Sequence, residues 1–225
     1  MPLHFAHPAA TCSAPSQQNQ ERTARVQAAK KRVTQVVGPW LAIGWLAEAA
    51  WQFAFVRNTP SSLVASALIL LAAVAAFQIA LARVHVVTPY FQAAPAWARR
   101  LLVFSVSVNA AWLSVAAALG VLIAVRATTD VPLVPIALVL AVVLALGGAY
   151  QTYSRRDPYY AAAMCWAFVG VYSEQVGAHP AVAGVLTGAI LANAAALVLV
   201  VTGMRAPQPG AAAQEVRQAL VEDEG

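Results

Sequence analysis

The sequence predicts an all-α membrane protein, a polytopic bundle of about six transmembrane helices. Two observations support this fold class. The 225-residue chain is 60% hydrophobic and only 10% charged, whereas a soluble domain usually carries about 25% charged residues. Several apolar runs also reach the ~20 residues that a helix needs to cross the hydrocarbon core of a bilayer. The lipid bilayer is therefore the first partner that the sequence predicts, and the identity of the membrane stays open.

Three regions of the chain differ in composition. Residues 1–33 are polar and are expected to form a disordered leader with a basic juxtamembrane cluster, in which 22–33 form a short surface helix. Residues 34–204 contain the apolar spans, and 205–225 form a polar tail with a short helix expected around 211–221. The leader lacks the hydrophobic stretch of a secretory signal, and whether it is a transit peptide stays open.

Turn residues divide the apolar region into separate spans. Prolines at positions 60, 132, 158 and 180 suit the first turn of a following helix, where a missing N–H is tolerated. The predicted spans cover about residues 38–56, 61–83, 101–125, 132–149, 159–176 and 181–203.

The basic residues test this division. If the chain crosses the bilayer six times, only Arg57 and Arg126 of its 14 Lys and Arg residues fall on the face opposite the termini. This distribution follows the positive-inside rule, so both termini are expected on the same, positive-inside face. Because the basic residues lie in the leader and at the ends of apolar runs, the net charge of +5 does not indicate nucleic-acid binding.

The sequence does not indicate an enzyme. It contains no GxSxG motif, no phosphate-binding loop and no nucleophile paired with a base. The histidines lie in the leader, at His4 and His7, or in separate links, at His85 and His179. No catalytic residue, metal ligand or resident cofactor is therefore predicted. The oligomeric state stays open, and a homo-oligomer is compatible with the sequence.

The segment GPWLAIGWLAEAAWQFAF, residues 38–55, places one carboxylate among three tryptophans. Glu48 falls near the middle of the first span, where an ionised carboxylate costs at least ~2.5–3.5 kcal/mol. We therefore expect Glu48 to face the bundle interior, to pair with a donor or to stay protonated. Helical spacing puts Trp51 and Gln52 beside Glu48, one turn further along, and Trp45 lies further round the helix.

The third predicted span carries a second stripe of polar and aromatic residues. Ser105, Asn109 and Trp112 lie on one helical face, because they are four and three residues apart. The amide of Asn109 offers donors that could pair with Glu48. Two interpretations stay open: the polar groups form structural hydrogen bonds between helices, or they contact a ligand or carry a proton.

Short motifs in three segments resemble one known family. WLAEAAWQFAFV, residues 45–56, resembles the Asn-x-x-Trp-x-x-x-Phe segment of the tryptophan-rich sensory protein/translocator protein family (TspO/MBR). Glu48 stands where that family has asparagine, and Trp51 and Phe55 match. The run from Trp112 to Ala116 resembles the family's Trp-x-Ser-x-Ala helix. The later RRDPYYAAAMCWAFVGVY is similar to a helix of longer bacterial and algal relatives, so the resemblance covers about 38–200.

The resemblance implies a helical membrane protein that binds a hydrophobic tetrapyrrole- or sterol-like ligand, such as a porphyrin, within the bundle. We expect aromatic faces and a few oriented polar groups to form such a site. The predicted ligand-binding residues are Trp45, Glu48, Trp51, Gln52, Asn109 and Trp112. Two alternatives are a proton-coupled small-molecule transporter that uses Glu48 and a structural membrane subunit.

Overall fold

The computed structural model describes residues 14–87 and 95–203, which are helical apart from short connections. These residues form seven α-helices. Their bounds are α1 (Ala14–Val36), α2 (Gly38–Val56), α3 (Pro60–Val87), α4 (Ala96–Thr128), α5 (Leu133–Arg155), α6 (Pro158–Gln175) and α7 (Pro180–Val201). The all-helical class predicted from the sequence is confirmed.

Helices α2 to α7 coincide with the six predicted spans. Helix α2 has the predicted bounds. The largest differences lie at the link between α3 and α4, where both helices extend beyond the predicted ends, and at the end of α5, which continues to Arg155 instead of residue 149. Pro60, Pro158 and Pro180 open their helices as expected, whereas Pro132 is the residue before α5. Four helices, α3, α4, α5 and α7, are long and apolar enough to cross a membrane. The number of six spans and the orientation of the termini stay predictions.

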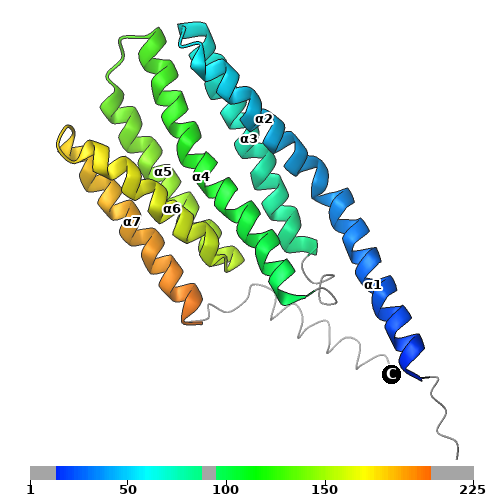
Figure 1. Ribbon diagram of the computed structural model, residues 1–225. Coiled ribbons are helices and arrows are strands. Elements are labelled where there is room, and N and C mark those ends of the chain that lie inside the picture. Colours follow the sequence, from blue (N-terminus) through cyan, green and yellow to red (C-terminus); the bar gives the residue numbers. More distant parts are fainter. Residues whose placement is uncertain (1–13, 88–94, 204–225) are drawn as a thin grey trace, which may run out of the picture.

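Helix α1 differs from the expected leader. It covers residues 14–33, where a disordered segment was expected, and is longer than the short surface helix predicted over 22–33. Figure 1 shows α1 continuing the direction of α2 beyond the bundle, so that the two helices form one long, slightly bent rod. Residues 1–13 and the helix expected around 211–221 lie outside the described residues.

The bundle consists of two groups of three helices. In the first group α3 lies between α2 and α4, and in the second α7 packs against both α5 and α6. The main contact between the groups is made by α4 and α6 (Figure 1). The phenyl group of Phe77 and the side chain of Phe168 are fully buried, one in each group. Between α2 and α3 the approach is close, because Gly44 presents no side chain to the ring of Phe77.

Candidate functional site

The predicted site residues on α2 do not gather around a common space. Trp45 is half exposed and meets the ring of Phe77 edge-to-face, with centroids 5.4 Å apart. The ring of Trp51 packs on that of Phe55 of the same helix, at 5.5 Å. Gln52 is exposed on the outer surface of the bundle.

Glu48 is half buried in an apolar part of the bundle. Its Oε2 atom and the indole Nε1 of Trp51 are both buried and have no hydrogen-bond partner among the described residues. Asn109 does not supply one, because its amide nitrogen donates to the carbonyl of Ser105 on its own helix, at 2.7 Å. Since α3 lies between α2 and α4, the expected pairing of Glu48 with Asn109 is not formed.

Trp112 lies in a different setting, on the seam between α4 and α6. Its ring stacks on that of Trp166 with centroids 4.9 Å apart and an interplanar angle of 35°. Nearer the start of both helices, Phe104 meets Tyr159 edge-to-face at 5.4 Å. The two pairs have nearly the same offset in residue number, so α4 and α6 run in the same direction and keep their register.

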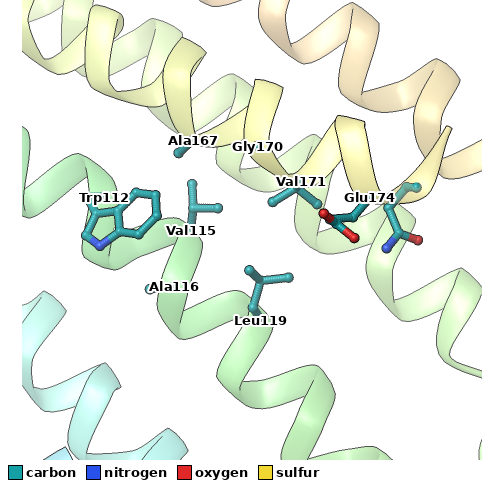
Figure 2. Close-up of a pocket in the computed structure, with 9 residues that line it drawn as sticks. Trp112, Val115, Ala116, Leu119, Ala167, Gly170, Val171 and Glu174 are labelled. Atoms are coloured by element: carbon teal, nitrogen blue, oxygen red, sulfur yellow. The ribbon is translucent and has the colours of Figure 1, made fainter. Parts of the chain in front are cut away.

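A partly open cavity of about 320 Å³ follows the tryptophan pair along this seam. Figure 2 shows the cavity with Trp112 at one end and the Glu174 carboxylate near Val171 and Leu119 at the other. A smaller apolar cavity of about 50 Å³ adjoins it between α4, α5, α6 and α7. The larger cavity is lined by Trp112, Val115, Ala116, Leu119, Ala167, Gly170, Val171, Glu174 and Gln175.

The lining is apolar except at the end of α6, where Glu174 and Gln175 supply a carboxylate and an amide. Gly170 leaves open space in the wall, since a Cβ there would meet no atom within 4 Å. The arrangement therefore offers a flat aromatic surface, an apolar wall and one polar end. These are the features of a small-molecule site, and the volume lies at the lower end of the usual ~300–1,000 Å³.

The register of α6 against α4 is set by Asp157, which is 1% exposed. Its carboxylate caps α6 by accepting hydrogen bonds from the backbone N–H groups of Tyr159 and Tyr160, at 3.1 Å and 3.2 Å. It also accepts a hydrogen bond from the hydroxyl of Ser107 on α4, and the imidazole Nε2 of His85 on α3 lies 3.7 Å away. Three helices are thus held together at the start of the α4–α6 seam.

A second polar group, the Gln78 cluster, joins four helices inside the bundle. The amide nitrogen of Gln78 on α3 donates to the hydroxyl oxygens of Tyr160 on α6, at 3.0 Å, and Ser114 on α4, at 3.3 Å. Its amide oxygen accepts a hydrogen bond from Gln151 on α5, at 3.0 Å. This cluster was not predicted from the sequence, although Gln78 is the one amide within the second predicted span.

Of the six predicted site residues, only Trp112 lines the α4–α6 cavity. Gly170, Glu174 and Gln175, which α6 brings opposite α4 in the same cavity, were not among the predicted site residues. Within the described residues no group of three His, Cys, Asp or Glu side chains could hold a metal ion.

Comparison with known proteins agrees with the helical membrane architecture. The chain matches the model of the TSPO-like protein family over residues 17–203, which is most of its length. No curated protein and no solved structure matches it.

Proposed function

Because the chain belongs to the TSPO-like protein family and is an integral multi-pass membrane protein, we propose that it binds a hydrophobic ligand within its helical bundle. The ligand is a flat molecule of tetrapyrrole- or sterol-like character, and its site is the cavity between α4 and α6. The proposed activity is binding without a chemical step.

The observation that supports this proposal is the pairing of an aromatic surface with adjoining apolar space. Trp112 is 41% exposed although its ring already stacks on Trp166, so part of its surface is available to a ligand. A flat ligand would cover this surface and occupy the open space beside Gly170. Aromatic stacking contributes about 0.5–1.5 kcal/mol beyond the area that it buries, and the few polar groups would orient the ligand.

The experiment titrates purified protein in detergent with an uncharged porphyrin ester and follows the quenching of tryptophan fluorescence. We expect saturable quenching in the native protein. Gly170→Phe fills the cavity and should weaken binding about tenfold or more, because the occluded volume removes the stacking and burial contacts. Gly188→Phe is the matched control: this glycine of α7 also has no atom within 4 Å of an added Cβ and lies outside the cavity lining.

Two results would contradict the proposal. Quenching that does not saturate would mean that the porphyrin partitions into the detergent alone. Equal affinities of the Gly170→Phe and Gly188→Phe variants would place the ligand elsewhere. The predicted α2 residues are tested in the same titration, since Trp51→Ala should weaken binding only if the ligand contacts α2.

A proton-coupled transporter is the second candidate, and the unpartnered Oε2 atom of Glu48 favours it. A carboxylate within a membrane-spanning helix that has no fixed partner is a candidate proton carrier. This function requires pH-dependent flux in reconstituted vesicles that Glu48→Gln abolishes, whereas ligand binding in the α4–α6 cavity survives that change. A structural subunit would show neither flux nor saturable binding.

A further inference from the structure

We infer that the ligand of the α4–α6 cavity is a cation. It is a flat apolar molecule with a positively charged nitrogen that pairs with the carboxylate of Glu174. This inference rests on the proposed function, because it concerns the same cavity, and it narrows the ligand to one charge class. A ligand whose polar group is a carboxylate is disfavoured.

The length of the cavity sets the separation between the two ends of the ligand. Trp112 lies beside Trp166 and Ala167 of α6, and Glu174 lies two helical turns beyond Ala167 on the same helix. At a rise of 1.5 Å per residue, these two turns span about 10 Å. A molecule about as long as three fused aromatic rings would therefore reach from the indole of Trp112 to the carboxylate.

Glu174 is the one charged side chain among the nine residues that line the cavity. Helical side chains lean toward the N-terminus of their helix, and Figure 2 shows the Glu174 carboxylate on the side of Val171 and Leu119, within the cavity. No salt bridge links Glu174 to any residue in the part of the chain that the structure describes. Its negative charge is therefore available to a ligand.

The charges around this end of the bundle do not cancel that of Glu174. The nearest basic residue along α4 is Arg126, which is exposed and follows Leu119 by seven residues, about 10 Å along the helix axis. This separation between Arg126 and the level of Leu119 in the cavity exceeds the Debye length of ~8 Å at physiological ionic strength. Asp130, in the connection after α4, is also exposed and lies outside the cavity lining.

The polar end of the cavity favours a cation. The Glu174 carboxylate attracts a positive nitrogen by direct charge interaction, while the aromatic body of the ligand packs on the indole of Trp112. An anionic ligand would keep the apolar contact with Trp112 and would meet repulsion at Glu174.

The test uses three anthracenes that differ only in the group at one ring position: an aminomethyl group, a methyl group or a carboxylate. At pH 7 they are a cation, a neutral molecule and an anion with the same aromatic body. Each is titrated into the full-length protein in detergent, and tryptophan quenching gives its Kd. The titrations are repeated with Glu174→Gln, which keeps the side-chain shape, and with Asp130→Asn, which removes one exposed negative charge outside the cavity lining.

We expect Glu174→Gln to weaken binding of the cation about fivefold, the upper range for an exposed charge pair. The same change should tighten binding of the anion and leave the neutral compound unchanged. Asp130→Asn should have no effect on any of the three. Because each comparison is made with one ligand in one detergent, partitioning of the ligand into the micelle cancels.

Two outcomes overturn the inference, and they are distinguishable. The first outcome has three parts: all three compounds bind, Gly170→Phe weakens the binding of each, and Glu174→Gln changes the binding of none. The cavity would then bind ligands without regard to their charge. In that case the proposed function stands and the inference fails. If the neutral compound shows no saturable binding to the native protein, the proposed function fails and the inference fails with it.

Discussion

The close approach of α2 and α3 gives a quantitative prediction for Gly44→Ala. A Cβ at residue 44 would lie 2.6 Å from Cε2 and 2.8 Å from Cδ2 of Phe77. Carbon atoms prefer separations of about 3.5–4.0 Å, so the two helices would have to move apart by about 1 Å. The ring of Phe77 has no room to turn, because it is fully buried and Trp45 packs against it edge-to-face.

The expected loss of stability follows from a matched comparison. Overpacking of this kind costs about 1–3 kcal/mol, while alanine is favoured over glycine in a helix by about 0.8–1.0 kcal/mol. Gly147→Ala in α5 gains the same propensity without the clash, since nothing lies within 4 Å of its Cβ. The propensity term cancels in the difference, so Gly44→Ala should be less stable than Gly147→Ala by about 1–3 kcal/mol.

Equilibrium unfolding in mixed micelles, with increasing SDS and tryptophan fluorescence as the signal, measures this difference. Introducing Phe77→Leu removes the ring edge that the new Cβ meets, so Gly44→Ala should then cost little. This double-mutant cycle isolates the contact between the two residues. Equal stabilities of Gly44→Ala and Gly147→Ala, or a cost that persists with Phe77→Leu, would refute the reasoning.

Three further changes test other contacts by the same unfolding assay. Asp157→Ala removes the cap of α6 and leaves buried N–H groups unsatisfied, so stability should fall by about 2 kcal/mol; an unchanged midpoint would mean that the cap is replaced. Gln78→Leu leaves the hydroxyl of Tyr160 without its donor and should cost about 1–3 kcal/mol, and a more stable variant would contradict this. Arg83→Met removes the guanidinium 5.1 Å from the ring centroid of Trp40 and should cost about 0.5–1 kcal/mol. An Arg83→Met variant as stable as the native protein would contradict a stabilising cation–π contact.

The positions of the helices could be predicted from the sequence because each is set by local properties. A run of apolar residues fixes the extent of a membrane helix, and proline at the first turn fixes its start, as at Pro60, Pro158 and Pro180. The spacing of polar and aromatic residues along the third predicted span also identified the helical face that carries Trp112, and Trp112 lines the α4–α6 cavity.

The partners of these faces could not be predicted, because helical period does not tell which helix lies opposite. Glu48 and Asn109 were expected to pair, but α3 packs between their helices. Trp112 instead meets Trp166, which lies beyond α5 in the sequence. The parallel register of α4 and α6 depends on the cap at Asp157, and this tertiary contact has no signature in the local sequence of α4.

The Gln78 cluster has a consequence for the order in which the protein is made. The partners of Gln78 lie 36, 73 and 82 residues later in the chain. At a synthesis rate of about 5–20 residues per second, the ribosome needs about 4–16 s to make the last of them. During this interval the amide of Gln78 lacks its hydrogen bonds to Gln151 and Tyr160. The cluster that joins α3, α4, α5 and α6 can therefore be completed only after the start of α6 has been made.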